Sequence, residues 1–445
     1  MAIRRYKATA DNTIANGYQE NLGTRATGSN MGQADVSEIY SIYGRATTSS
    51  AELSRIITQF DVASITSDRT AGVIPASGSM SFYLRLYNAE TSKTVPRDFN
   101  LVVSAVSRSW TEGDGLDLEN YKDLGKSNWI SASTTTAWTT EGGDYHASPT
   151  FEQTFDTGLE DLDLDVTSLV EQWIAGSKTN YGFGIQLTSS QETATTSYYT
   201  KRFFARGTQY FFKKPVIEAR WNSSTQDDRG DFYMSSSLAP ADDNLNTLYL
   251  YNYVRGQLTN IPAIGTGEVY VDLYETLGGT ALTQALETPA TGGYVSVGVY
   301  SCSVGLTGTY STLYDVWYSG STEYFTGTVS PKSFGGSGAS TGNNRRIAKI
   351  KNLRAKYFSE EEARFNVFVR NKNWSPTIYT VASSVVENTI IPSASFRVYR
   401  VLDGLNVIPH GTGSDLQTIL SYDVSGNYFN LDMSLLESGY EYGIK

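Results

Sequence analysis

Apolar and polar residues alternate along most of this chain, in short runs that are separated by turn residues. In the run "SMSFYLRLYNA", Tyr83 and Arg85 fall on one face of a strand, whereas Phe82 and Leu84 fall on the other. Because successive side chains of a strand point to opposite faces, such runs predict strands that are buried on one side. Similar runs recur about every 8–12 residues, which is typical of β-sandwiches. The pattern therefore predicts an all-β chain.

The stretch "DLDLDVTSLVEQWIAGSKTNYGFGIQL" departs from this pattern. Its first residues alternate as in a strand, with Asp161, Asp163 and Asp165 on the side expected to face solvent. A helix of about two turns should follow, because four apolar residues then recur at helical spacing. These residues are Leu169, Val170, Trp173 and Ile174. We predict one short amphipathic helix that caps an open end of a sandwich and buries its tryptophan.

Both ends of this helix carry recognisable signals. Thr167 and Ser168 offer hydroxyl groups for an N-cap, and Ser168 with Glu171 fits a capping box. Gly176 is suited to the left-handed position that follows the last turn of a helix. The sequence thus predicts a helix that begins close to Ser168 and ends before Gly176.

Two polar segments divide the chain into three blocks. Residues 222–231 have the composition of a polar linker, and residues 331–344 are rich in Gly and Ser, as in a flexible connector. We therefore predict domains over residues 1–221, 232–330 and 345–445. The strand pattern of the second and third domains predicts immunoglobulin-like or fibronectin III-like sandwiches.

Composition and charge narrow the range of partners. The net charge is −11 and the pI is near 4.9, whereas a surface that grips nucleic acid needs a basic stripe. The one basic cluster, from Asn343 to Lys356, is short, and we interpret it as a solvated linker and an edge strand. We expect no nucleic-acid partner.

The redox state and the route of the chain follow from its cysteine content and its first residues. Cys302 is the single cysteine, which excludes an internal disulfide bond. No apolar run follows the basic residues Arg4 and Arg5, so no signal peptide is expected. No segment is long and apolar enough to span a membrane. We expect synthesis in a reducing cytoplasm, without membrane insertion.

Several ordered motifs resemble a known family. The order of "DVTSLVEQWIAGSKTNYGFGIQL", "RFFARG" and "KKPVIEARW" is similar to that of the DNRLRE domain. The earlier motifs "TADNTI", "SRIITQFDV" and "SRSWTEGDG" agree with it. The resemblance covers about residues 5–221. It implies that the first block is a jelly-roll-type β-sandwich, similar to carbohydrate-binding modules.

The stretch from Met1 to Val36 also resembles virion structural proteins of tailed phages that infect marine bacteria. In such a protein, host lysis replaces a secretion signal. The resemblance implies a non-enzymatic structural protein in the neck, the tail, the head surface or a fibre of the virion. Its partners would be other virion proteins and copies of itself. The alternative is a carbohydrate-binding adhesin or a receptor-binding fibre module, with a host-surface glycan as its partner.

The stretch "LDMSLLESGYEYGIK" resembles the approach to strand F of a fibronectin III or immunoglobulin-like sandwich. The resemblance implies a tyrosine corner, formed by Tyr440 or Tyr442. One strand of the sandwich would then be missing. We expect either that residues past Lys445 supply it or that a neighbouring subunit donates it, because an unpaired edge attracts a strand.

The three aspartates before the helix have the spacing of the first ligands of a calcium loop. An EF-hand also requires Gly and Glu at the positions where Val166 and Gln172 stand. We therefore favour a solvated strand face, with a calcium site in a sandwich loop as the alternative. No metal and no other cofactor is expected.

Other short motifs lack the context that their chemistry needs. Residues 338–342 match the G-x-S-x-G pattern of a nucleophile elbow, but they lie in a Gly/Ser-rich linker. His146 and His410 lie in different blocks, with no second histidine at zinc-binding spacing. The tripeptide Arg229–Asp231 matches an integrin-type motif, and chance is the better account. We predict no catalytic residue, and an enzyme acting on polysaccharide is the least favoured class.

Trp129 and Trp138 lie in the Ser/Thr-rich loop "KSNWISASTTTAWTTEGGDYH" and leave two interpretations open. Either ring could be a platform on which a sugar stacks. The favoured interpretation is that the rings close the loop onto the edge of the sandwich, because large aromatic side chains are usually buried.

Overall fold

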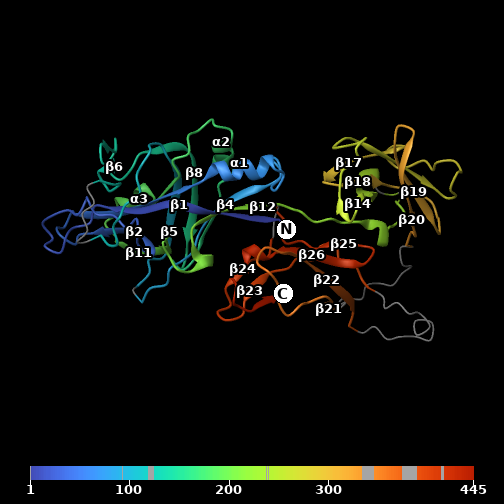
Figure 1. Cartoon of the computed structure of the whole chain (residues 1–445). Helices are drawn as coiled ribbons and strands as arrows, with labels where there is room; N and C mark the ends of the chain where they lie inside the picture. Colours follow the sequence, from blue (N-terminus) through green and yellow to red (C-terminus); the bar gives the residue numbers. More distant parts are fainter. Residues whose placement is uncertain are drawn as a thin grey trace.

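Figure 1 shows the computed structural model of the chain, in which antiparallel sheets form three blocks. The structure describes residues 2–92, 94–118, 125–236, 238, 240–332, 345–372, 388–411 and 415–445. The α-helices within these ranges are α1 (Val62–Thr70), α2 (Thr167–Ile174) and α3 (Ser189–Glu192). Single 3₁₀ turns are η1 (Phe211–Lys213), η2 (Asp228–Gly230), η3 (Ala241–Asn244) and η4 (Met433–Leu435). The predicted all-β class is confirmed.

The first block, residues 1–221, is built on a ten-stranded sheet with the order β8-β5-β10-β3-β1-β12-β4-β9, and β2 and β11 branch from β3. Its strands are β1 (Ile3–Ala15), β2 (Val36–Tyr43), β3 (Ala51–Phe60), β4 (Ser81–Leu86), β5 (Phe99–Val106), β8 (Tyr145–Phe155), β9 (Leu162–Asp165), β10 (Phe183–Leu187), β11 (Tyr198–Phe204) and β12 (Val216–Arg220). A separate hairpin joins β6 (Ser131–Ser133) and β7 (Thr136–Ala137).

The long strand β1 connects the two arms of this sheet. Its first half pairs with β12 and its second half with β3, with an irregularity in register between Ala8 and Ala10. Side chains of both arms enter one core, including Leu84 of β4 and Leu101 of β5, which are completely buried. Tyr83 faces away from this core, as the alternation predicts, because its neighbours in the strand face inward.

Helix α2 confirms the predicted apolar face. Leu169, Val170 and Trp173 are buried in the core of the first block, and Ile174 packs against it. Gly176 follows the helix with a φ of +70°, as a left-handed C-terminal residue should. The helix therefore covers one end of the sandwich, as the sequence predicts.

The predicted capping box is wrong. The N-cap residue is Val166, which has no side-chain cap. Thr167 donates its hydroxyl to Asp165 instead, at 2.6 Å, and Glu171 forms an ion pair with Arg69 of helix α1 at 2.6 Å. The box fails because an ion pair to a neighbouring helix occupies the glutamate.

The first block contains two α-helices, α1 and α3, in addition to the single helix that the sequence predicted. Helix α1 begins at Val62, directly after β3 and the N-cap residue Asp61. Asp61 starts the helix, because its carboxylate accepts hydrogen bonds from the backbone of Ala63 at 3.0 Å and from the hydroxyl of Ser64 at 2.5 Å. Periodicity missed α1 because the helix is only weakly amphipathic, with two buried residues.

The middle block, residues 232–330, is one six-stranded antiparallel sheet in the order β13-β18-β17-β16-β19-β20, with a hairpin of β14 and β15 beside it. Its strands are β13 (Asn246–Tyr251), β14 (Tyr253–Val254), β15 (Gln257–Leu258), β16 (Val269–Tyr274), β17 (Ala290–Ser296), β18 (Val299–Val304), β19 (Leu313–Ser319) and β20 (Thr322–Val329). The sequence predicted two facing sheets here. Loop residues such as Phe232 and Ile261 instead complete the core that the sheet starts.

The third block, residues 345–445, has two sheets, in the orders β21-β22-β26-β25 and β24-β23-β27. Its strands are β21 (Arg346–Ile350), β22 (Glu362–Asn371), β23 (Val398–Arg400), β24 (Asn406–Ile408), β25 (Ser421–Asp423), β26 (Gly426–Asp432) and β27 (Tyr442–Ile444). Phe365 and Phe429 of one sheet share a core with Val398 and Ile408 of the other. The block is a two-layered sandwich, and β21 is the edge strand predicted within the basic cluster.

The tyrosine corner is present at Tyr442. Its hydroxyl donates to the backbone oxygen of Glu437 at 2.8 Å, whereas Tyr440 is 41% exposed. Strand β27 pairs with β23 and lies at the end of its sheet. A strand added to this edge remains a prediction.

Residues 222–231, predicted to be a polar linker, are docked between the middle and third blocks, and we call them the connecting segment. Asp227 is 4% exposed, and its backbone N–H donates to the carbonyl oxygen of Tyr422 at 3.0 Å. Asp228 contacts both blocks, because it accepts hydrogen bonds from the hydroxyl of Tyr422 at 2.8 Å and from the backbone of Thr247 at 2.7 Å. The polar groups of this linker are thus buried with hydrogen-bond partners from two blocks, which its composition alone does not indicate.

Candidate functional site

A charged network covers the outer face of the first block where β1, β12, β4 and β9 lie side by side. At its centre is Glu218 of β12, which is completely buried. Its carboxylate accepts hydrogen bonds from Arg5 at 2.7 Å, from Arg220 at 2.8 Å and from Arg85 at 3.2 Å. Three guanidinium groups from three strands therefore meet on one buried carboxylate.

The electrostatics of Glu218 keep it charged. Burial alone would raise the pKa of Glu218, but the positive charges of Arg85, Arg5 and Arg220 outweigh burial and hold the pKa far below its usual range. The carboxylate therefore stays ionised near neutral pH and is poorly suited to proton transfer. The role of Glu218 is therefore structural, because its charge binds arginines from three strands.

One of the three predicted acids belongs to this network. Asp163 of β9 accepts a hydrogen bond from Arg220 at 2.9 Å and lies 3.9 Å from Arg85. Its side chain is 39% exposed, so the network extends from a buried centre to the surface. Asp163 thus forms ion pairs with arginines of neighbouring strands, whereas the alternating pattern predicted only that it faces outward.

The network lies against the third block. The second terminal nitrogen of Arg5 donates to the backbone oxygen of Val407 at 2.6 Å, which connects β1 to β24. Ile3 and Phe212 of the first block are both buried in the core of the third block. The ring of Phe212 lies edge-on to Tyr442, with 6.4 Å between ring centroids. The two blocks therefore share apolar side chains as well as a charged contact.

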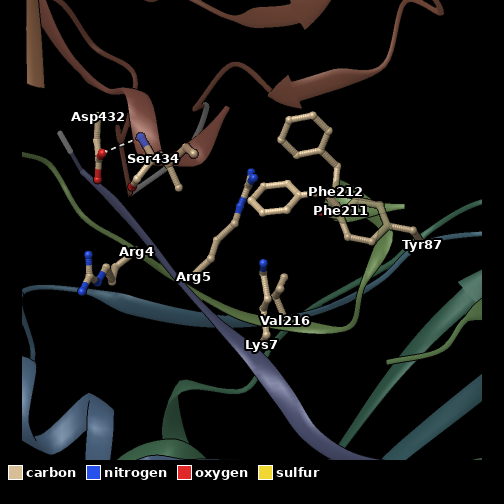
Figure 2. Close-up of a pocket in the computed structure, with 10 residues that line it drawn as sticks. Arg4, Arg5, Lys7, Tyr87, Phe211, Phe212, Val216, Asp432 and Ser434 are labelled. Atoms are coloured by element: carbon tan, nitrogen blue, oxygen red, sulfur yellow. Dashed lines mark hydrogen bonds between the residues drawn. The ribbon is translucent and has the colours of Figure 1, made fainter. Parts of the chain in front are cut away.

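A small cavity of about 120 Å³ lies at this junction. Figure 2 shows Lys7 and Arg5 extending from β1 toward the phenylalanine rings, with Asp432 and Ser434 of the third block nearby. Its lining residues are Arg4, Arg5, Lys7, Tyr87, Phe211, Phe212, Val216, Asp432, Ser434 and Leu435. The ammonium group of Lys7 lies 3.9 Å from the centroid of Phe211. A cavity of this size suits water or a small ion and is too small for a sugar or a nucleotide.

Charge in this cavity is crowded. Burial and the positive charges of Lys214 and Arg5 lower the pKa of Lys7. Arg4 is paired with Asp68 at 3.0 Å, and Arg5 is paired with the buried glutamate of the network. Arg4 and Arg5 are therefore paired within the first block, and Arg5 also reaches the third block through the backbone oxygen of Val407.

The other two predicted acids have separate partners. Asp161 accepts a hydrogen bond from the backbone of Asn88 at 2.7 Å, and Asp165 accepts from the backbone of Thr167 at 2.9 Å. The residues that the structure describes contain no group of three His, Cys, Asp or Glu side chains with a geometry suited to a metal. The exposed strand face is confirmed, whereas the absence of a bound ion remains a prediction.

The two loop tryptophans are buried, so the interpretation as sugar platforms is wrong. Trp129 is 3% exposed and Trp138 is 6% exposed, and both pack in one cluster with Trp110. The indole N–H of Trp138 donates to the backbone oxygen of Asn128 at 2.8 Å. These rings close the loop onto the sandwich edge because their large apolar area is removed from water there.

The remaining motifs do not come together. Both charged residues of the integrin-type tripeptide are paired inside the protein, Arg229 with Asp315 and Asp231 with Lys332, each at 2.6 Å. The G-x-S-x-G pattern at 338–342 lies outside the described residues. His410 lies 3.3 Å from the hydroxyl of Ser395 in the third block, far along the chain from His146 in β8.

Sequence reasoning missed an aromatic face on the middle block. Tyr270 and Tyr274 of β16 lie opposite Tyr318 and Tyr314 of β19 in the register of the sheet. All four side chains are partly exposed. The signal was available, since the alternation in "GEVYVDLYET" and "TLYDVWYSG" puts these tyrosines on the face opposite the apolar residues.

Models of known protein families match no part of this chain, and a search of curated proteins finds no similar sequence. Among the described residues, no helix has both the length and the apolar character needed to cross a membrane. The resemblance to the DNRLRE domain and to phage virion proteins therefore stays a prediction.

Proposed function

We propose that this chain is a non-enzymatic structural protein of a tailed-phage virion, which assembles with other virion proteins and with copies of itself through its β-sheet surfaces. It would be made in the host cytoplasm and reside in the virion, as a component of the neck, the tail, the head surface or a fibre.

The observation that carries this proposal is the junction between the first and third blocks. Arg5 contacts Glu218 and Val407 at once, and Ile3 enters the core of the third block. Hydrogen bonds to charged groups depend strongly on geometry, so the contact of Arg5 with Val407, together with the shared apolar core, favours one orientation of the blocks over others. A fixed orientation is what a building unit needs and what a mobile enzyme lid does not need.

Exposed apolar side chains on the middle block give such a unit a surface for neighbours. Tyr253 is 61% exposed, Val254 50% and Val297 56%. The first two lie in the hairpin of β14 and β15, and Val297 lies in the turn between β17 and β18. A hydrogen bond from the backbone N–H of Asn252 to the backbone oxygen of Gly298, at 2.8 Å, joins the two hairpins. Clustered exposed apolar residues mark protein contacts more often than single ones do. We interpret these two hairpin tips as a contact with another subunit of the particle.

Mass spectrometry of purified virions from the phage that encodes this chain tests the proposal. We expect the chain in the particles at a constant ratio to the major capsid protein after density-gradient purification. Recovery only in the soluble lysate, and never with particles, would contradict the proposal. Light scattering of the purified chain, with the double variant Val254→Ser and Val297→Ser as a comparison, would show whether the hairpin tips drive self-association.

A further inference from the structure

Four tyrosines form a two-by-two array on the outer face of the middle block, and we call Tyr270, Tyr274, Tyr314 and Tyr318 the tyrosine array. Tyr270 is directly opposite Tyr318, and Tyr274 is directly opposite Tyr314. The rings of the first pair are 6.1 Å apart and inclined at 36°. Residues four apart along a strand are separated by roughly 13 Å, so the array extends over the length of several sugar rings.

The core side chains of the same strands fix the direction of the array. Val271 and Leu273 of β16 and Trp317 of β19 are completely buried on the inner face. Because side chains alternate along a strand, the tyrosines must project from the outer face. Rotation of the strand to hide the rings would expose the core, so the aromatic face is a fixed feature of the sheet.

Carboxylates hold one pair of rings in place. Asp272 lies between Tyr270 and Tyr274 in the strand and is 8% exposed, and it accepts a hydrogen bond from the hydroxyl of Tyr318 at 3.0 Å. The hydroxyl of Tyr270 donates to Glu268 at 3.1 Å. Burial, followed by the hydrogen bond to Asp272, raises the pKa of Tyr318 to about 12. The ring is thus held in one orientation and keeps its hydroxyl proton near neutral pH.

The charge of the middle block limits which polymers can approach. Between residues 232 and 330 the only cationic side chain is Arg255, against eight carboxylates, which gives a net charge of −7. The carboxylates are Asp242, Asp243, Glu268, Asp272, Glu275, Glu287, Asp315 and Glu323. An anionic polysaccharide or a nucleic acid would be repelled by this block, whereas an uncharged polymer would not.

We propose that the tyrosine array binds a neutral polysaccharide, with sugar rings stacked on Tyr270 and Tyr318 and sugar hydroxyl groups hydrogen-bonded to the neighbouring carboxylates. Tyrosine supplies a large apolar face together with a polar tip, which matches the mixed surface of a sugar. Glu268 and Glu323 are exposed beside the rings and can accept hydrogen bonds from hydroxyl groups. Asp272 is a positioning residue in this proposal, because it holds the ring of Tyr318.

Rings held before binding favour affinity, because less side-chain freedom is lost when the ligand arrives. This site goes beyond the assembly function proposed above and does not depend on it. It also replaces the buried tryptophans with a different set of aromatic residues as the point of contact with sugar.

The test is calorimetry of the full chain with cellohexaose, maltohexaose and chitohexaose, and with an alginate oligomer as the anionic comparison. We expect at least one neutral hexaose to bind and the alginate not to bind. Tyr270→Ala and Tyr318→Ala should each weaken that binding by about tenfold, the loss of one aromatic contact. Tyr294→Ala removes a tyrosine of the same block that is 36% exposed and lies outside the array, and it should leave the affinity unchanged. Circular dichroism checks the fold of each variant.

Asp272→Asn separates a positioning role from a general loss of structure. We expect ultraviolet titration to show that the pKa of Tyr318 falls toward its ordinary value in this variant, together with a smaller loss of sugar affinity than in Tyr318→Ala. The proposal would be overturned if none of the three neutral hexaoses binds, if only the alginate binds, or if Tyr294→Ala abolishes binding while the array variants do not.

Discussion

Arg229 and Asp315 form a two-pronged ion pair, with both nitrogen–oxygen distances at 2.6 Å, that joins the connecting segment to the interior of the middle block. Asp315 is completely buried and also accepts a hydrogen bond from the indole of Trp317 at 2.7 Å. Arg229 is largely covered, with 14% of its side chain exposed. The connecting segment is thus attached to the middle block by a charged contact that water screens little.

Arg229→Ala should destabilise the middle block by about 3–5 kcal/mol, because it leaves the Asp315 carboxylate buried without its counter-charge. Hydrogen exchange of the middle-block strands, followed by mass spectrometry, measures this change locally. Arg364→Ala is the matched control, since Arg364 pairs with Asp423 with 46% of its side chain exposed. That exposed pair should contribute less than about 1 kcal/mol. Equal effects from the two variants would contradict the expectation.

Trp173→Ala should lower the free energy of unfolding of the first block by about 3–5 kcal/mol, as for other truncations of large core side chains. Trp173 is 5% exposed, and its ring meets Phe183 edge-on, with 4.8 Å between centroids. Denaturant titration measures the loss. Leu159→Ala, at a residue that is 57% exposed, should change stability by less than about 0.5 kcal/mol. A small effect at Trp173 would mean that helix α2 does not seal the core.

Asp227 should make stability depend on pH. Burial raises the pKa of Asp227 to about 6, against opposing interactions with Arg229. A carboxylic acid with a raised folded-state pKa binds its proton more tightly when folded. Its contribution is therefore complete below the unfolded-state pKa of about 4 and is lost as the pH rises through about 6.

Asp227→Asn removes this titration. We expect the wild-type chain to lose up to about 3 kcal/mol relative to the variant between pH 4 and pH 8, an upper figure for a shift of about two units. Thermal melts of both proteins across this range make the comparison, and all other titrating groups cancel between them. Parallel stability curves for the two proteins would show that the charge on Asp227 is tolerated in the folded state.

Tyr442→Phe should cost about 1 kcal/mol, because it removes one hydrogen bond of 2.8 Å to the backbone oxygen of Glu437. Tyr440→Phe is the matched control, since this neighbouring ring is 41% exposed and can keep its contact with Arg400 as phenylalanine. Chemical denaturation of both variants provides the comparison. An equal or larger loss in Tyr440→Phe would argue against the tyrosine corner.

Chelation should leave the melting temperature unchanged. Asp161, Asp163 and Asp165 each have a hydrogen-bond partner within the protein. A bound ion would stabilise the folded state by mass action, so its removal would lower the melting temperature. Differential scanning calorimetry with and without EDTA, and again after addition of calcium, measures the effect. A drop with EDTA that calcium reverses would establish a metal site.

Local patterns predicted the elements that depend on local physics. Alternation identified which side chains of β4 enter the core, and helical spacing identified the buried face of α2. The resemblance of the last residues to a fibronectin III or immunoglobulin-like sandwich implied a tyrosine corner at Tyr440 or Tyr442, and the structure has it at Tyr442. Each of these features is decided within a few residues of the chain. The capping box was wrong because Glu171 is bound by Arg69 from a distant part of the chain.

Features that depend on contacts between residues far apart in the sequence could not be predicted from local patterns. The contact of Glu218 with Arg5 joins residues from the two ends of the sequence of the first block, which become neighbours because β1 pairs with β12. The tyrosine array likewise needs the register of β16 with β19 before two pairs of rings become one face. The connecting segment has a polar composition, yet Asp228 finds its partners on two different blocks. Composition reports polarity and does not report where partners lie.

The apolar residues that the first block contributes to the third have a consequence for synthesis. Ile3 leaves the ribosome long before Leu431, yet both belong to the same core cluster. Until the later strands are made, Ile3 and Phe212 have no core to enter. A nascent chain that lacks the third block would expose them together with the arginines beside them, whereas the third block covers them once it has folded. The first block therefore presents an apolar and basic surface until the third block folds against it, and that surface is absent once the two blocks have joined.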